Sequence, residues 1–406
     1  MHHKSNKPEL LAPAGNFEKL RVAIDYGADA VYLSGKDYSL RTLSPNFADH
    51  ELEQAILLAR DKGVKTYLAV NIFARNSDLK PIVTFLERIK ILNPDAVIIA
   101  DPGIIILAQR IIPHIPIHLS TQANTTNINA VRFWQDQGIS RINAARELSL
   151  SEIKEIVEST SIEIETFIHG AMCISYSGRC LLSSALSRRS SNQGLCSHPC
   201  RWQYHVMEEQ RPGEFHPIAE DGRGTYIFNS RDLCMIDHIP ALIDAGIKSF
   251  KIEGRMKGLS YLASTVKTYR EAIDSYIAAP CAYKISDQWH DELDLIYHRP
   301  YSTGFYFHPG NETLPNHSNS SQGKMHSFTG IIETQLPGNR VMLSVKNKIS
   351  TGDNVEILPF VGPPVKSKVL AIEDNNGTPI AAAQPNTNSV LTLEHPTSGR
   401  FIVRKI

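Results

Sequence analysis

The chain has 406 residues, of which 42% are hydrophobic, and this is enough for one large domain and a smaller one. Lysine plus arginine and aspartate plus glutamate number 42 each, so the net charge gives no argument for steering a polyanion to the protein. The longest apolar stretch, residues 96–108, is interrupted by Asp101, Pro102 and Gly103, so the sequence excludes a membrane-spanning helix there and we expect none elsewhere.

A repeated unit runs along the first part of the chain. An amphipathic segment ends at a glycine, and a short β-branched run begins one to three residues later, at Gly27, Gly63, Gly138 and Gly246. Glycine readily adopts the left-handed conformation that closes a helix, so each joint predicts the end of a helix followed by a strand. The predicted strands are residues 9–13, 30–34, 65–71, 95–100, 116–120, 141–145, 162–168 and 249–253.

Strands that alternate with helices in this way predict an α/β fold, a (β/α)8 TIM-like barrel over residues 1–310. The alternative is a doubly wound sheet, which is disfavoured because no Gly-x-Gly-x-x-Gly turn follows the first strand. An insertion at about 170–247 separates the last two strands and carries five of the six cysteines. Because barrels carry their chemistry on loops after the strands, we expect the functional site there.

A polar stretch at residues 311–323 predicts a linker. Residues 324–406 beyond it predict a small C-terminal β-barrel domain, and we expect few contacts to cross the linker. The predicted strands of the C-terminal domain are residues 329–334, 340–345, 354–358, 366–372, 389–393 and 401–403.

The cysteines of the insertion indicate a metal centre. The first residues of the chain lack the apolar core of a signal peptide, so we expect a cytoplasmic protein, in which clustered cysteines are metal ligands or catalytic groups. Their irregular spacing lacks the paired Cys-x2-Cys knuckles of zinc ribbons and favours an iron–sulfur cluster. The alternative is that they are buried small hydrophobic residues, and we assign this role to the isolated Cys281.

Residues 170–207 contain no acidic side chain but several basic and aromatic ones. Arginines beside aromatic rings are suited to phosphate contact and to stacking on an unpaired base, so this segment predicts RNA binding. The alternative is that the arginines balance the charge of a cluster or form ordinary ion pairs. The candidates are Arg179, Arg188, Arg189, Arg201 and Trp202.

Polar residues near the predicted strand ends are further candidates, and we expect them to converge on one mouth of the barrel. Arg146 and Arg255 are suited to bind carboxylates, since a guanidinium matches a carboxylate with two hydrogen bonds. The alternative is a pair of ordinary ion pairs, with Glu147 and Glu253. We assign catalytic roles to His169 as a proton carrier, Glu147 and Tyr176, and substrate contacts to Asn71, Gln122, Arg146, Glu253 and Arg255.

Residues 165–173, Glu-Thr-Phe-Ile-His-Gly-Ala-Met-Cys, and residues 178–183, Gly-Arg-Cys-Leu-Leu-Ser, together resemble the signature of the collagenase-like peptidase U32 family. Residues 9–15, 145–149, 192–194, 199–202 and 251–256 are similar to the family as well. The resemblance implies oxygen-independent hydroxylation, of RNA bases with prephenate or of the ubiquinone ring. It also implies a 4Fe–4S cluster on Cys173, Cys180, Cys196 and Cys234, with an exchange of Cys196 for Cys200 left open.

Residues 347–356 resemble the β-domain that follows the barrel in the transfer-RNA hydroxylases of this family. This implies that the C-terminal domain binds RNA, that the partner is a tRNA anticodon loop, and that prephenate donates a hydroxyl group to a wobble uridine, which becomes 5-hydroxyuridine. The alternatives are the longer 23S rRNA cytidine hydroxylases and the ubiquinone-pathway members, which resemble the barrel alone. One departure is Arg189-Ser190-Ser191, where the family leads us to expect an Asp-Pro pair.

Other enzyme classes lack support in the sequence. The motifs His-Glu-x-x-His, Gly-x-Ser-x-Gly and Gly-x4-Gly-Lys-[Ser/Thr] are all absent. A peptidase that pairs Cys196 or Cys200 with His198 or His169 is an alternative, but a thiolate bound to iron cannot attack a peptide bond. A non-catalytic RNA-binding protein with a structural cluster is another alternative.

Overall fold

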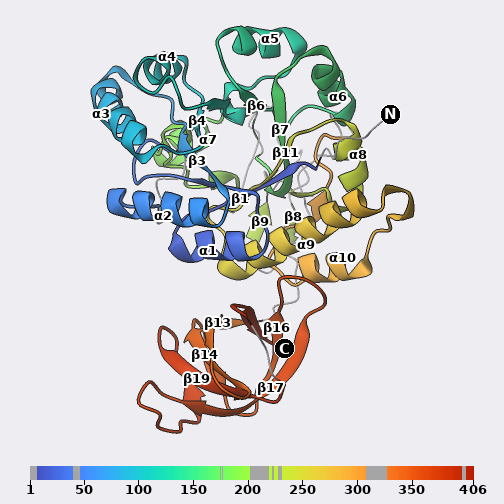
Figure 1. Cartoon of the computed structure of the whole chain (residues 1–406). Helices are drawn as coiled ribbons and strands as arrows, with labels where there is room; N and C mark the ends of the chain where they lie inside the picture. Colours follow the sequence, from blue (N-terminus) through green and yellow to red (C-terminus); the bar gives the residue numbers. More distant parts are fainter. Residues whose placement is uncertain are drawn as a thin grey trace.

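The computed structural model describes residues 7–39, 46–173, 175, 177–201, 219–221, 224–226, 231–307, 327–395 and 399–406. Eight parallel strands form a barrel that helices surround (Figure 1). They run in the order β11-β1-β2-β3-β4-β5-β6-β7, and the pairing of β11 with β7 closes the ring. The strands are β1 (Glu9–Pro13), β2 (Ala30–Leu33), β3 (Lys65–Val70), β4 (Ala96–Ile99), β5 (Ile117–Leu119), β6 (Arg141–Asn143), β7 (Glu163–Ala171) and β11 (Ser249–Ile252). The predicted (β/α)8 barrel is thereby confirmed.

The glycine joints are built as the sequence predicts. Gly27, Gly63, Gly138 and Gly246 all have positive φ, at +98°, +69°, +77° and +79°. The helices of this part are α1 (Phe17–Asp25), α2 (Asp49–Asp61), α3 (Asn76–Leu92), α4 (Pro102–Ile111), α5 (Ile128–Asp136), α6 (Leu150–Ser159), α8 (Ile239–Asp244), α9 (Leu259–Ala278) and α10 (Asp287–Asp294). None of these described helices has the length and apolar character of a membrane span.

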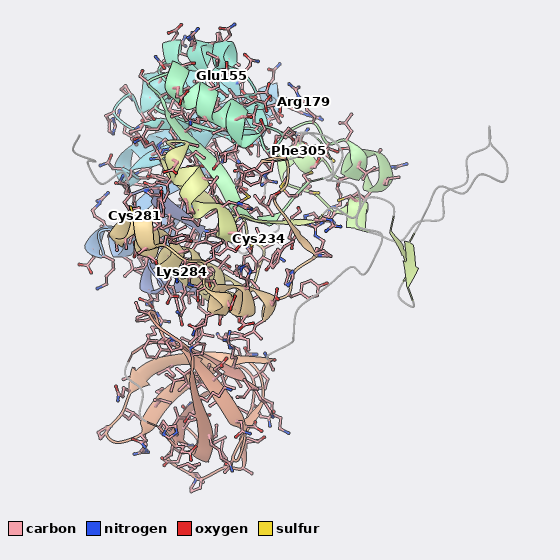
Figure 2. The ribbon with its side chains drawn as sticks, turned by 90° about the vertical axis from the view of Figure 1, so that its right-hand side faces the viewer. Glu155, Arg179, Cys234, Cys281, Lys284 and Phe305 are labelled. Carbon is pink, nitrogen blue, oxygen red and sulfur yellow. The ribbon has the colours of Figure 1, made fainter. Side chains whose placement is uncertain are left out.

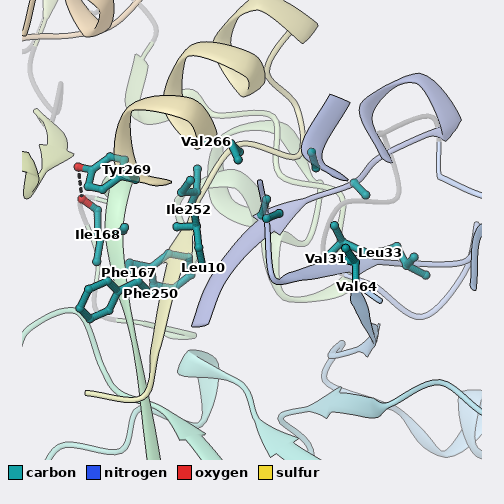
Figure 3. Packing of buried hydrophobic residues seen from close by; sticks show 14 of the residues in the cluster. Leu10, Val31, Leu33, Val64, Phe167, Ile168, Phe250, Ile252, Val266 and Tyr269 are labelled. Carbon is teal, nitrogen blue, oxygen red and sulfur yellow. Dashed lines mark hydrogen bonds between the residues drawn. The ribbon is translucent and has the colours of Figure 1, made fainter. Parts of the chain in front are cut away.

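Strand residues that face outward pack against the helices in one apolar core, in which Leu10, Phe250 and Ile252 lie close together (Figure 3). The interior of the barrel is different, because a charged network occupies part of it. The Nη1 atom of Arg141 lies 2.6 Å from Oε1 of Glu9, and Lys251 Nζ lies 2.7 Å from Glu165 Oε1. No local pattern in the sequence predicts this network.

A second barrel follows in the chain. Its six antiparallel strands are closed in the order β13-β14-β19-β17-β16-β20, which confirms the predicted C-terminal β-barrel. They are β13 (Ser327–Gln335), β14 (Arg340–Val345), β16 (Asn354–Leu358), β17 (Val365–Glu373), β19 (Asn388–Leu393) and β20 (Ile402–Lys405), and a small pair, β15 (Ile349–Ser350) with β18 (Ala382–Ala383), accompanies them. The predicted linker, residues 311–323, lies outside the described residues.

The second barrel packs closely against the first, next to α9 and α10 (Figure 1). The hydroxyl of Tyr26 in the turn after α1 donates to the Leu358 carbonyl at 2.7 Å and accepts from the Ile402 amide at 3.1 Å. Arg404 of β20 is 1% exposed and lies between the carboxylates of Glu292 and Glu356. The expectation of few contacts between the domains is therefore wrong, because a buried, hydrogen-bonded interface joins them.

Candidate functional site

The site is built at the end of β7, which continues beyond the barrel. Strand β10 (Asp232–Cys234) pairs with it antiparallel, so that Cys234 lies opposite His169 and Asp232 opposite Ala171. Strand β12 (Tyr301–Ser302) adds to β10 on its other side. The insertion thus returns to the barrel sheet and brings Cys234 next to the strand that leads into Cys173 (Figure 2).

Cys173 and Cys180 form a pair on the loop after β7. A hydrogen bond from the Cys173 thiol lowers the pKa of Cys180 to about 5, and the amides of Leu182 and Ser183 at the start of α7 (Leu182–Ser187) contribute to the same effect. The same hydrogen bond raises the pKa of Cys173. The hydrogen bond between the two sulfurs therefore favours a single negative charge on the pair, and a thiolate is the form of cysteine that binds metals.

The loop that carries Cys196 packs on α7. The amide of Ser197 donates to Ser183 Oγ at 3.1 Å, and Ser191 Oγ donates to the Cys180 carbonyl at 2.8 Å. Cys200 follows in a turn of 3-10 helix, η3 (Pro199–Arg201). Helix α7 therefore links the segment of Cys196 to the segment of Cys180.

The cysteines fit a metal cluster in their chemistry but are not gathered as a complete ligand set. Their donor chemistry fits, since the Cys173–Cys180 pair already favours a thiolate, but within the described ranges no three His, Cys, Asp or Glu side chains come together as metal ligands. The structure thus brings two of the four predicted ligands together and does not add Cys196 or Cys234 to them. Burial raises the pKa of Cys234 to about 11.

Arg146 follows β6 and lies beside the cysteine loop. Its guanidinium carbon stands 4.0 Å from the ring centroid of Phe167, and Nη1 donates to the Ala171 carbonyl at 3.4 Å. Its buried Nε has no hydrogen-bond partner among the described residues. A small pocket opens here, lined by Ala144, Ala145, Arg146, Leu148, Thr166, Phe167, Met172, Leu233, Gly304, Phe305 and Tyr306.

Glu147 supports the cysteine loop. Its carboxylate accepts a hydrogen bond from the Ser177 amide at 2.9 Å, between Cys173 and Cys180 in the sequence. Within the described part of the chain, Glu147 forms no ion pair with Arg146, which was the alternative for both residues. Glu147 therefore fixes the position of the loop, and no pattern in the sequence predicts this contact.

Gln122 contacts the same loop from η1 (Thr121–Ala123), the turn after β5. Gly178 has a φ of +74°, and a Cβ atom there would lie 2.4 Å from the Gln122 carbonyl oxygen, so only glycine fits this approach. The buried Oε1 of Gln122 has no hydrogen-bond partner among the described residues. Gln122, Arg146 and Glu147 thus surround the loop that joins the two paired cysteines.

His169 lies elsewhere, which corrects the expected convergence on the mouth. Its ring packs among Tyr261, Tyr269 and Tyr301, on the side of α9 and β12, and the residue is 1% exposed. Burial lowers its pKa to about 3, so the ring is neutral at physiological pH. A register shift between β7 and β11 places His169 opposite the outward-facing Ile252.

The remaining substrate candidates are Arg255, Glu253 and Asn71. Arg255 is 4% exposed and donates through Nη2 to Ser39 Oγ and Asn46 Oδ1, each at 3.0 Å. It therefore braces the chain that follows β2. The carbonyl of Glu253 accepts from Tyr261 at 2.7 Å, and Asn71 directly follows β3.

Two of the predicted RNA-binding residues, Arg179 and Arg188, are exposed, and Arg189 Nε donates to the Leu195 carbonyl at 3.1 Å. Three leucines nearby in the chain, Leu181, Leu186 and Leu195, are exposed as well. The side chain of Arg201 and the residues Trp202 and Tyr176 lie outside the described part of the structure.

Fold and site together define a class: a (β/α)8-barrel protein with a cysteine pair on the loop after its seventh strand and a second, six-stranded barrel docked to it. The chain belongs to peptidase family U32, whose pattern matches residues 15–315. The pattern of the peptidase family U32 C-terminal domain matches residues 324–404.

Three relatives indicate the range of activities in this family. The chain is 39% identical to tRNA hydroxylation protein P1 of Bacillus subtilis (strain 168), over 94% of this chain and 90% of the relative. It is 38% identical to tRNA hydroxylation protein P of Escherichia coli (strain K12), over 87% of this chain and 86% of the relative. It is 35% identical to the 23S rRNA 5-hydroxycytidine C2501 synthase of the same organism, over 67% of this chain but only 40% of the relative.

Proposed function

We propose that the protein is an RNA hydroxylase that converts the wobble uridine of tRNA to 5-hydroxyuridine. The observation that carries the proposal is the similarity to tRNA hydroxylation protein P1, which extends over 94% of this chain and therefore over both barrels. Hydroxylation of a 23S rRNA cytidine is the second candidate. It has less support, because the chain spans only 40% of that relative.

The reaction defines what the co-substrate must do. Replacing the C5–H bond of uridine by C5–OH is a two-electron oxidation, so a reaction without molecular oxygen needs a source of the oxygen atom and an acceptor of two electrons, and a single donor that exchanges its hydroxyl group for the hydrogen serves as both. We propose prephenate as this donor and the cytoplasm as the compartment. A 4Fe–4S cluster held by Cys173, Cys180, Cys196 and Cys234 would supply electron-transfer chemistry beside it.

Arg146 is the residue we propose for a carboxylate of the donor. The stacking on Phe167 at 4.0 Å holds the guanidinium plane, and its Nε lacks a partner among the described residues. A fork of N–H donors in this state can bind a carboxylate with two parallel hydrogen bonds. Phe305 and Tyr306 line the same pocket and would exclude water from the bound ion pair.

The tRNA must present its base out of the stack, since a barrel mouth cannot reach a base within a helix. Arg179 lies on the cysteine loop and Arg188 directly follows α7, and both are exposed and can contact anticodon-loop phosphates. We propose that the C-terminal barrel adds affinity for the rest of the tRNA.

Nucleoside mass spectrometry of RNA from a deletion strain tests the proposal. We expect 5-hydroxyuridine-derived nucleosides of tRNA to be lost, and to return with the wild-type gene but not with one that encodes Arg146→Ala. A strain that lacks prephenate should lose them as well. Normal tRNA nucleosides together with a missing 5-hydroxycytidine in 23S rRNA would favour the second candidate. Turnover by purified, iron-loaded protein distinguishes an enzyme from a structural RNA-binding protein.

A further inference from the structure

The hydroxyl of Tyr269, on α9, has four polar neighbours. It donates to the Ile168 carbonyl at 2.9 Å, a contact drawn in Figure 3, and accepts from the Met235 amide at 3.0 Å. The Cys234 sulfur stands 3.7 Å from the same oxygen, and His169 Nδ1 stands 3.3 Å from it. Tyr269 is therefore the buried polar group through which α9 contacts Cys234.

These neighbours exceed what one hydroxyl can satisfy. A phenol has one hydrogen to donate and two lone pairs to accept with, so at most three of the four contacts are hydrogen bonds at one time. While Cys234 is a thiol, its S–H can donate to the tyrosine oxygen, and the tyrosine hydrogen remains on Ile168. A cysteine bound to a metal is a thiolate and can only accept, so this arrangement cannot persist.

The surrounding backbone permits the alternative arrangement without leaving a buried group unsatisfied. The Met235 amide lies 3.0 Å from the Ile168 carbonyl as well as 3.0 Å from the Tyr269 oxygen. When the tyrosine hydrogen turns toward sulfur, Ile168 keeps the Met235 amide as its donor and no buried carbonyl is left unsatisfied.

We propose that Tyr269 is a positioning residue that donates its hydroxyl hydrogen to the sulfur of metal-bound Cys234. This inference rests on the proposed cluster and adds a residue to it. Hydrogen bonds to ligating sulfur stabilise the more reduced, more negative state of an iron–sulfur centre and so raise its reduction potential. The hydroxyl thus makes the centre easier to reduce.

The same helix offers a matched control. Tyr261 is also buried, its ring also contacts His169, and its hydroxyl donates to the Glu253 carbonyl at 2.7 Å. Replacing either tyrosine by phenylalanine removes one buried hydroxyl and keeps the ring. Among the described contacts, only Tyr269 joins its hydroxyl to a cysteine.

The experiment is a redox titration of the anaerobically purified, iron-loaded full chain, monitored by the electron paramagnetic resonance of the reduced centre. We expect Tyr269→Phe to shift the midpoint potential to a more negative value, and Tyr261→Phe to leave it at the wild-type value. If Tyr269→Phe is folded by circular dichroism but loses iron that Tyr261→Phe retains, the hydroxyl is needed for the ligated thiolate and the proposal is supported.

Other outcomes overturn the inference. An unchanged potential in Tyr269→Phe, or an equal shift in both variants, would mean that the hydroxyl serves only packing. Full iron content in Cys234→Ser would remove Cys234 from the ligands, and Tyr269 with it. A wild-type protein that binds no iron would contradict the proposed cluster itself, which separates that failure from the failure of the Tyr269 assignment.

Discussion

Arg404 of the small barrel and Glu292 of the large one form a two-pronged ion pair, with Nη1–Oε1 and Nη2–Oε2 distances of 2.7 Å each. Glu356 accepts a third hydrogen bond from Nε, also at 2.7 Å. The guanidinium is thus fully engaged by carboxylates from both barrels. Breaking a buried pair of this kind leaves a charge without its partner.

We expect Arg404→Met to lower the free energy of unfolding by about 3–5 kcal/mol, because two buried carboxylates would lose their counter-ion. Urea unfolding followed by tryptophan fluorescence measures the change. Lys154→Ala is the control, since its pair with Glu158 is exposed on α6 and worth under about 1 kcal/mol. Equal effects of the two substitutions would show that the junction contributes little to stability.

Acid should destabilise the protein partly through Glu9. Burial acts to raise the pKa of this carboxyl, but the Arg141 guanidinium outweighs it and the folded-state pKa lies below the ordinary 4.5. The unfolded chain then takes up the proton more readily, so this contribution is present above about pH 4.5 and is lost as the pH falls toward the lower folded-state value. Glu9→Gln should flatten the decline in stability as the pH falls below about 4.5. Glu53→Gln, on the exposed face of α2, should not.

We expect serine substitutions at the different cysteines to have different effects on iron content. We expect about four irons per chain in anaerobically purified protein, with broad absorption near 400 nm. Replacing Cys173, Cys180, Cys196 or Cys234 with serine should abolish binding, whereas Cys281→Ser should have no effect. Iron that survives the loss of Cys196 but not of Cys200 would exchange these two residues, and zinc without iron would exclude the cluster.

Gly178→Ala should disturb the cysteine loop without unfolding the protein. The added methyl group would meet the Gln122 carbonyl at 2.4 Å and push Cys180 away from Cys173. We expect reduced iron content at nearly unchanged melting temperature. Gly63→Ala is the control, because Gly63 also has positive φ but no atom within 4 Å of the added carbon. Iron loss in both variants would point to general strain.

Arg146→Ala should lower kcat/KM on the order of 100-fold while the iron content stays at the wild-type value, since a bound carboxylate would lose its charged partner. Arg146→Lys should recover only part of the activity, because an ammonium cannot form the two-pronged contact. Arg132→Ala, on exposed α5, serves as the control. Steady-state rates with tRNA and prephenate give the comparison, and equal activity of the Arg146→Ala and Arg132→Ala variants would remove Arg146 from the site.

The barrel could be predicted from the sequence because its signals are local. A glycine such as Gly27 closes a helix by its own conformational freedom, and the β-branched run after it specifies the next strand. The cysteine loop was also visible as a pattern of residues. The contacts of that loop could not be predicted. Glu147 contacts Ser177 because two consecutive strands, β6 and β7, end at the same edge of the sheet.

The prediction for His169 shows a different limit. Its place near the end of a strand predicts that it faces the mouth, but a register shift between β7 and β11 places it opposite the outward-facing Ile252. The prediction of few contacts between the two barrels was wrong for a third reason. Arg404 and Glu292 are 112 residues apart, and no local pattern pairs two charges over that distance.

The bonds of Tyr26 have a consequence for how the protein is made. Its hydroxyl meets the Ile402 amide, 376 residues later in the chain. During synthesis on the ribosome, the first helix of the large barrel therefore emerges long before its partner Ile402 is translated. Until the C-terminal barrel is translated, the Tyr26 hydroxyl lacks its two backbone partners, Leu358 and Ile402, and its ring lacks the contact with Phe360.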